Sequence, residues 1–464
     1  MNQDPNFNPI NRRRFLKLSA CAAVGTTSLF DTLLNLRQLN AASAGVLGSN
    51  EDYKALVCIF LYGGNDSNNT LIPTNTADYS LYAAGREQLT LPKSELLALA
   101  SLNTQGRPFG IHPSLTGCRD LFDSGDLAFV ANVGTLFAPA SLSDFRNKTS
   151  AIPSHLFSHS DQQVLWQTSV KEDPAAVRTG WGGRAADLIH SIHNDQSTSM
   201  LVSIAGANFF QVGENLLPFH MDAAGARSYE ILNGSDQYAT TRAESFRQLL
   251  ERDYAHKMEQ TFADISLSSI KNADTFNAAI GDASSFDMLP NTGLGDQLRM
   301  VAKLIQSREA LGQRRQIFFV ATGGYDTHGP QLNQHAGLLS ELDGAIKGFH
   351  GALDSINALD KVTSFTASDF GRTFDSNGRG SDHGWGGHHM VMGGAVNGQR
   401  IYGQFPNITP GSEHDTGRGR WLPTTSVDQY GATIARWFGL SESELPSVFP
   451  NIGNFATSNL GFMA

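Results

Sequence analysis

Residues 368–389, SDFGRTFDSNGRGSDHGWGGHH, gather carboxylate, imidazole and guanidinium side chains with little apolar material between them. Solvated loops rarely bring several imidazoles together unless something binds them. Carboxylate oxygens and imidazole nitrogens are the donors that divalent cations prefer, and their negative charge offsets that of the cation. The residue types of this stretch therefore predict a metal site.

Similar side chains follow three apolar runs that predict buried strands. In chain order they are Asp66, then Asp326 with His328, then Asp369 with Arg372. The carboxyl ends of parallel strands meet at one edge of a sheet, so we expect these groups to converge, joined by His383, His388 and His389. The pairs Gly63-Gly64 and Gly323-Gly324 permit the tight turns that this requires. A single Asp after a strand often caps the next helix, and that alternative stays open for each one alone.

The chemistry of this donor set favours a catalytic site over a structural one. No Cys lies in these stretches, which argues against a structural zinc site of the thiolate type. Zinc fits the His content best, whereas manganese, magnesium or calcium fit the carboxylates. The sequence therefore predicts a divalent metal and leaves its identity open.

A candidate nucleophile lies in LFSHSDQQVLWQ, ahead of a predicted helix. Ser160 and Gln163 have the spacing of a capping box, so Ser160 is expected to cap that helix. Ser158 then remains free for chemistry. A hydroxyl at a helix N-terminus meets the positive end of the backbone dipole, which favours its alkoxide.

The elements that would position these groups alternate between strand and helix. Short apolar runs predict strands at 56–62, 127–133, 200–205, 317–321, 362–366 and 389–392. Helical periodicity predicts helices at 294–311, 335–353 and 424–438, and a helical insert or cap over the sheet at about 239–288. This alternation predicts a mostly parallel sheet with helices on both faces.

Residues 1–44 predict an export signal. Arg12 and Arg13 precede Phe15-Leu16-Lys17, a modestly apolar run covers 18–30, and Ala42-Ser43-Ala44 suits signal peptidase. This resembles a twin-arginine signal, which implies the twin-arginine export machinery as a partner and a periplasmic or secreted protein. A basic amphipathic anchor is the alternative, and the small residues at its end argue against it. We expect no membrane span in the mature chain.

Charge and cysteine content exclude other classes. The chain carries 34 Lys and Arg against 44 Asp and Glu, and without residues 1–44 the balance is 29 against 42. So acidic a body predicts no nucleic-acid binding. Outside the predicted signal only Cys58 and Cys118 remain, and we expect two buried thiols rather than a disulfide.

Five stretches carry a family resemblance that extends over nearly the whole of residues 45–464. They are LYGGNDSNNTLIP, LFSHSDQQVLWQT, GGYDTHGPQ, SDFGRTFDSNGRGSDHGWGGHHMVMGGAVNGQRIYGQFP and GRWLPTTSVDQYGATIARWFG. With them the chain resembles the bacterial domain-of-unknown-function family fifteen-oh-one, whose members resemble the alkaline phosphatase and sulfatase superfamily. The resemblance implies an alkaline phosphatase-like three-layer α/β sandwich. It also implies one or two divalent ions and a Ser, Thr or modified Cys nucleophile.

The resemblance assigns roles to single residues. It implies metal ligands at Asp66, Asp326, His328, Asp369 and His383. Ser158 would be the nucleophile, and His159 and Arg372 would hold the oxygens of the ester. Arg372 would otherwise pair with Asp375 or Asp369. Phe370 departs from the pattern, because the superfamily has His at that place.

Two functions follow from these observations. The first is an exported, metal-dependent hydrolase of phosphate or sulfate esters, acting on a small-molecule or polymer substrate. The second is a non-catalytic protein that keeps the fold, with or without a metal, and assembles with an exported partner protein. Phe370 favours the second function and the Asp and His set favours the first. A carbon-ester hydrolase ranks last, because no Gly-x-Ser-x-Gly elbow is present.

Overall fold

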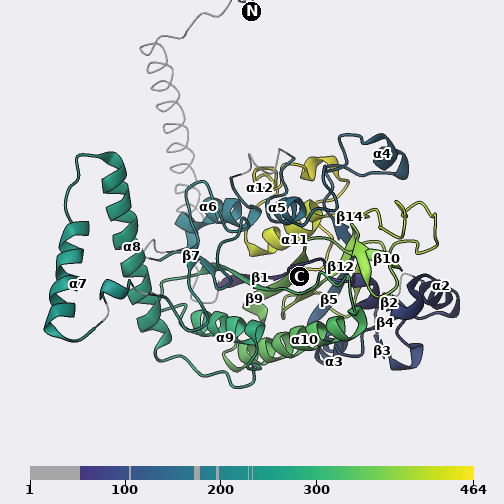
Figure 1. Cartoon of the computed structure of the whole chain (residues 1–464), viewed down its shortest axis with the longest axis horizontal. Coiled ribbons are helices and arrows are strands. Elements are labelled where there is room, and N and C mark those ends of the chain that lie inside the picture. The colour runs from purple at the N-terminus through teal and green to yellow at the C-terminus, as the bar shows by residue number, and fades with distance from the viewer. Residues whose placement is uncertain (1–52, 104–105, 172–177, 195–197, 228, 233) are drawn as a thin grey trace, which may run out of the picture. The chain divides into compact units, whose positions relative to one another are not determined.

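A computed structural model describes residues 53–464 except 104–105, 172–177, 195–197, 228 and 233. The predicted export signal, residues 1–44, lies outside the described residues. The centre of the described structure is a nine-stranded sheet (Figure 1). Eight of its strands follow the order β13-β5-β12-β9-β1-β8-β6-β7, and the ninth, β14, pairs with β5. Only β12 runs antiparallel to its neighbours, so the sheet is mostly parallel, as the sequence predicts.

The six predicted strands are all confirmed. They are β1 (Lys54–Leu61), β5 (Leu127–Gly134), β6 (Leu201–Ser203), β8 (Arg315–Thr322), β9 (Val362–Ser368) and β12 (Gly387–Met392). The edges of the sheet add the short strands β7 (Phe219–His220), β13 (Ile401–Tyr402) and β14 (Thr425–Ser426). Two small sheets lie outside it, one of β2 (Leu71–Pro73), β4 (Phe109–Ile111) and β3 (Leu97–Ala98), and one of β10 (Arg372–Ser376) and β11 (Ser381–His383).

Helices cover both faces of the sheet, which makes three layers (Figure 1). One face packs against α3 (Thr116–Ser124), α9 (Gly293–Gln306) and α10 (Gln331–Ser355). The other packs against α5 (His159–Thr168), α6 (Trp181–His193), α11 (Val427–Phe438) and α12 (Leu445–Val448). Further helices are α2 (Thr76–Arg86) and α4 (Leu142–Asn147).

The side chains of β1 show why the central strands are apolar throughout. Val57 and Ile59 join the core on one face, and Leu56 and Phe60 join the core on the other. Alternate residues of a strand point to opposite faces, so a strand covered on both sides has no polar face. Cys58 and Cys118 are both buried and free, which confirms the prediction of two separate thiols.

The predicted helical insert contains two helices, α7 (Gln237–Leu250) and α8 (Lys257–Ile280). They enclose a small core of their own, and α8 also contacts α9. Figure 1 shows them on the side of the protein away from β10. Because β10 carries Arg372, the two helices lie away from the residues that are predicted to form the site. None of the helices in the described part of the chain is long and apolar enough to cross a lipid bilayer.

A buried carboxyl group lies at the start of α11. Asp428 accepts hydrogen bonds from the Ser169 hydroxyl and from the backbone nitrogen of Asn451 (3.2 Å). Burial raises the pKa of Asp428 to about 7, although these hydrogen bonds oppose the shift. The folded protein therefore keeps this group protonated at a pH where the unfolded chain has ionised it.

Asp428 should make stability depend on pH. Below about pH 4 the group is protonated in both states, and between about pH 4 and pH 7 only the unfolded state loses the proton, so stability falls as pH rises. We expect Asp428→Asn to lack this decline, so that its free energy of unfolding rises relative to wild type by a few kcal/mol, at about 1.4 kcal/mol per pKa unit. Urea denaturation of both proteins at pH 4.5 and pH 7.5 measures the difference. If the free energy of unfolding of Asp428→Asn differs from that of wild type by the same amount at both pH values, the raised pKa of Asp428 is contradicted.

Candidate functional site

The three central strands end at the same level. In the parallel register Leu61 of β1 pairs with Thr322 of β8 and with Ser368 of β9. The segments that follow them, containing Gly63-Gly64, Asp326 and Asp369, therefore leave the sheet side by side. This is the edge at which α/β sheets bind ligands.

Gly63 and Gly64 allow those segments to approach closely. Gly63 has φ +114°, and a Cβ there would lie 2.4 Å from the backbone nitrogen of Asp326. Gly64 has φ +84°, and a Cβ there would lie 2.5 Å from the Phe370 ring. Only glycine meets both requirements at these positions.

The carboxylate of Asp326 is the meeting point of three imidazoles. Its Oδ1 lies 2.9 Å from Nε2 of His328 and 3.2 Å from Nε2 of His383, while its Oδ2 lies 3.5 Å from Nε2 of His159. His159 begins α5, and His383 ends β11. The Asp326 and His328 side chains are each 44% exposed, so the cluster is open to solvent on one side.

Each imidazole has its other nitrogen held by an oxygen. His159 Nδ1 lies 2.6 Å from Oδ2 of Asp369, and His383 Nδ1 lies 2.7 Å from the Phe157 carbonyl. His328 Nδ1 lies 3.2 Å from Oδ1 of Asp382. A carbonyl or carboxylate oxygen only accepts hydrogen bonds, so each Nδ1 carries the proton in the neutral ring. The three Nε2 lone pairs are then directed at the same region, which is the arrangement that metal-binding histidines show.

The spacing of these atoms suits a cation. Nε2 of His328 and Nε2 of His383 are 3.0 Å apart. Two lone pairs at this distance repel each other, and a proton or cation between them would make the contact favourable. Ligands about 2.0–2.1 Å from a tetrahedral zinc ion lie about 3.3–3.4 Å from one another. The separations of 2.9, 3.0 and 3.2 Å among His328, His383 and Asp326 are only slightly shorter. In addition, His159, Asp326 and His383 each offer an atom within 4.8 Å of the others. The donor set therefore fits a divalent metal of the zinc type.

The protein environment shifts the pKa values of these groups in different directions. The hydrogen bond that His159 donates to Asp369 raises the pKa of His159, and burial lowers the pKa of His383. Burial alone would raise the pKa of Asp326, but the hydrogen bond and charge of Arg372 outweigh burial and lower it. Asp326 is therefore a carboxylate at neutral pH, as a metal ligand must be.

Arg372, predicted to touch substrate or to pair with Asp375 or Asp369, instead holds Asp326. Its side chain is buried, and Nη1 donates to Oδ1 of Asp326 (2.7 Å) and to the Gly63 carbonyl (3.2 Å). Nη2 donates to the Ser381 carbonyl. These contacts occupy the guanidinium, so it orients Asp326 rather than facing a ligand.

Two predicted ligands have other partners. Oδ2 of the buried Asp369 accepts from His159, from Gln163 (3.0 Å) and from the Gly63 nitrogen (3.2 Å). Asp66 is also buried, and its Oδ2 accepts from Arg86 and Gln331. The structure therefore brings Asp326, His328 and His383 together, sets Asp369 behind His159, and keeps Asp66 in an ion pair with α2.

The serines of the α5 segment differ from expectation. The N-cap residue is Ser158 rather than Ser160, and its side chain does not bond to the helix backbone. Its hydroxyl donates to Oδ2 of Asp161 and lies 3.2 Å from the Ser160 hydroxyl. The capping-box spacing was misleading, because the helix begins two residues earlier than the spacing implies.

Phe370 forms an apolar wall of the site. Its ring stacks on His383 with the centroids 4.7 Å apart, and it lies 4.9 Å from the His159 ring. The expectation that His388 and His389 join the cluster is wrong. Both are buried in β12, where His388 stacks on Phe405 and His389 packs on Trp166. Burial lowers the pKa of each to about 3, so they are neutral core residues.

Several residues that hold the cluster were not predicted from the sequence. Asp382 orients His328, Gln163 supports Asp369, and the Phe157 carbonyl orients His383. Asp382 is adjacent to His383, so its role near the ligands could have been predicted from the sequence. A backbone carbonyl gives no signal in any sequence.

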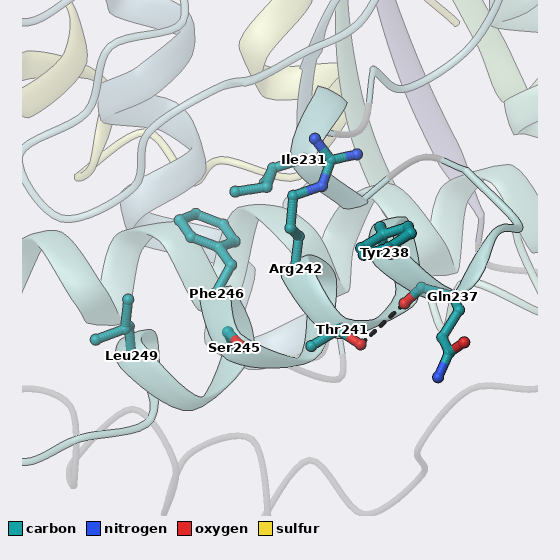
Figure 2. A pocket seen from close by; sticks show the side chains of 8 residues that line it. All are labelled: Ile231, Gln237, Tyr238, Thr241, Arg242, Ser245, Phe246 and Leu249. Atoms are coloured by element: carbon teal, nitrogen blue, oxygen red, sulfur yellow. Dashed lines mark hydrogen bonds between the residues drawn. The ribbon is translucent and has the colours of Figure 1, made fainter.

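A concavity of about 560 Å³ lies elsewhere, along α7 (Figure 2). Its lining consists of Ile231, Gln237, Tyr238, Thr241, Arg242, Ser245, Phe246 and Leu249. This set contains no carboxylate or imidazole, so it has no ligands for a metal. The chemistry of the chain therefore points to the strand ends and not to this concavity.

Comparisons with known proteins identify a family and find solved structures with low sequence identity to the chain. The sequence profile described as "Protein of unknown function (DUF1501)" matches residues 53–443. No curated protein sequence is significantly similar to the chain. Among solved structures, the lipoteichoic acid synthase LtaP from Listeria monocytogenes is 8% identical with a TM-score of 0.34, over 88% of this chain and 79% of that one. Alkaline phosphatase from the Antarctic bacterium TAB5 is 11% identical with a TM-score of 0.27, over 75% and 94%.

The close approach at Gly63 is testable by substitution. We expect Gly63→Ala to lower the free energy of unfolding by about 2 kcal/mol or more, because the new Cβ meets the Asp326 backbone and φ is positive. Gly323→Ala is the matched control, since a Cβ at Gly323 would meet no atom within 4 Å. Urea denaturation measures both variants. Equal stability of the two would show that the turn tolerates a side chain.

Proposed function

Since the chain belongs to the DUF1501 family of proteins of unknown function, its chemistry must be argued from its own residues, and we propose that it is a metal-dependent hydrolase of phosphate or sulfate esters. One observation carries the proposal: the Nε2 atoms of His159, His328 and His383 all face the carboxylate of Asp326. We propose these four side chains as the metal ligands. Zinc suits three imidazoles and one carboxylate best, with manganese, magnesium or calcium as alternatives.

Groups behind the ligands support this role. Asp369, Asp382 and the Phe157 carbonyl fix the orientation of the three rings, and Arg372 fixes that of Asp326. Metal ligands held in this way lose little freedom on binding. The earlier candidates Asp66 and Asp369 serve in this proposal as buried supports and not as ligands.

We propose Ser158 as the nucleophile. It lies between Phe157, whose carbonyl holds His383, and His159, whose ring faces Asp326. Its hydroxyl hydrogen points to Asp161, which would accept the proton as Oγ bonds to phosphorus or sulfur and the ester alcohol leaves. Water would then hydrolyse the seryl intermediate. A bound divalent metal would supply Lewis-acid stabilisation of the negative charge.

Cellular context completes the proposal. We propose export by the twin-arginine route, on the basis of residues 12–44, with the periplasm or the exterior as the place of action. The second candidate is a metal-binding or assembly protein without activity. The exposed apolar side chains of α7 and α8, among them Tyr238 (84%), Met258 (76%) and Phe262 (64%), favour it, because such surfaces often bind other proteins.

Metal content tests the ligand assignment. We expect the purified protein to hold about one divalent ion per chain, and Asp326→Asn and His383→Gln to lose it, because each removes a donor. His220→Gln is the matched control, since His220 is an exposed histidine on β7. Elemental analysis after dialysis measures the ion. Equal metal in wild type and in the two ligand variants would refute the site.

Turnover separates the two candidate functions. With aryl phosphate, phosphodiester and aryl sulfate substrates, we expect Asp326→Asn and Ser158→Ala to lower kcat/KM by about a hundredfold or more. Ser160→Ala should keep most of the activity, because Ser160 is the neighbouring exposed hydroxyl. A protein that holds metal yet hydrolyses none of these esters would support the assembly role.

A further inference from the structure

Arg420 lies beside the candidate metal ligands and has an unusual set of contacts. Its Nε donates to the backbone carbonyl of His383 at 2.9 Å. Its guanidinium carbon lies 4.5 Å from the centre of the Phe157 ring. Both contacts are made with residues that form the cluster, since His383 faces Asp326 and the Phe157 carbonyl holds His383.

The outer edge of this guanidinium is unoccupied by protein. Among the residues that the structure describes, Arg420 has no ion pair, and neither Nη1 nor Nη2 has a hydrogen-bond acceptor. The other guanidiniums nearby are in use, because Arg372 holds Asp326 and Arg418 pairs with Asp382 at 2.6 Å. Arg420 is partly buried, and burial lowers its pKa, although it remains a cation.

The loop that carries Arg420 is fixed on both sides. Oδ1 of Asp415 accepts from the nitrogens of Gly417 and Gly419, each at 2.8 Å. On the other side, Trp421 is buried and its ring nitrogen donates to Asn68 at 2.8 Å. Gly419 has φ +63°, and a Cβ there would lie 2.1 Å from Cβ of Phe374. The backbone therefore holds Arg420 in one place before any ligand arrives.

We propose that Arg420 is an oxyanion clamp, in which Nη1 and Nη2 bind two oxygens of a phosphate or sulfate group seated at the cluster. The proposal deepens the proposed function and rests on it for the position of the ester. A planar guanidinium presents two parallel N–H donors that match two oxygens of a tetrahedral anion. The stacking on Phe157 and the bond from Nε leave this edge free and fix its direction. The clamp thereby takes the role that the sequence assigned to Arg372.

Binding of inorganic phosphate and sulfate tests the clamp without relying on turnover. Isothermal titration of metal-loaded protein should show that Arg420→Gln weakens phosphate binding about ten- to a hundredfold, because a charged, two-point contact is lost. Arg420→Lys keeps the charge but not the fork, so it should restore only part of the affinity. Arg400→Gln is the control, since Arg400 is also half-buried but donates to the Gly398 carbonyl. The same series with sulfate shows which anion the site prefers.

The outcomes separate this proposal from the metal site. Unchanged phosphate affinity in Arg420→Gln and Arg420→Lys, with metal content equal to wild type, would overturn the clamp and leave the metal proposal intact. If the wild type holds no metal, titration of the metal-free protein decides. Phosphate binding that Arg420→Gln abolishes would then support the clamp, and absence of phosphate binding would overturn it. Circular dichroism and melting temperature identify any variant that does not fold, and Arg420→Lys then carries the test.

Discussion

The contact between Arg372 and Asp326 holds the site together. A buried guanidinium requires a counter-charge, and Asp326 supplies it from a position that is itself 44% exposed. One oxygen of the carboxylate thus faces a fixed internal cation and two imidazoles at once. Since Arg372 also donates to the carbonyls of Gly63 and Ser381, the same side chain ties the exits of β1 and β8 to the β10–β11 hairpin. The position of the three rings depends on this arrangement.

A chain of buried hydrogen bonds begins at Ser381, which also contacts Arg372, and it accounts for the buried polar side chains of Gln331, Asp66 and Arg86. Ser381 donates through its hydroxyl to Oε1 of Gln331 (2.6 Å), and Gln331 donates to Asp66. Asp66 in turn pairs with Arg86, whose Nη1 donates to the carbonyls of both Thr373 and Phe374. Every step is buried, so the loss of one partner would leave another polar group without a hydrogen bond. The buried carboxylate of Asp66 therefore contributes to the geometry of the site without touching it.

The sequence predicted the frame of the molecule better than the roles of its charged residues. Strands such as 56–62 could be predicted because burial on both faces makes every side chain apolar. The convergence of the segments that carry Asp326 and Asp369 followed from the rule that parallel strands end at one edge, whereas His383 reaches Asp326 from the separate β10–β11 sheet. The ion pair of Asp66 could not be predicted, because Arg86 lies on a helix 20 residues away and nothing local marks it as buried. Arg372 and Arg420 are equally basic in sequence, and only their surroundings show which one has a free edge.

Phe370 bears on how many cations the site can hold. Its ring lies against both His159 and His383. An aromatic hydrocarbon offers no lone pair, so a second cation on that side would lack a donor. On the adjacent carboxylate, Oδ2 of Asp369 already accepts from His159, Gln163 and the Gly63 nitrogen, while its Oδ1 is buried without a hydrogen-bond partner. Within the described part of the chain, the imidazole nitrogens that come close enough to share an ion, those of His159, His328 and His383, all lie around the single carboxylate of Asp326. The ligand chemistry thus favours one ion, and in the proposed clamp Arg420 would supply the positive charge that a second ion would otherwise bring to the ester.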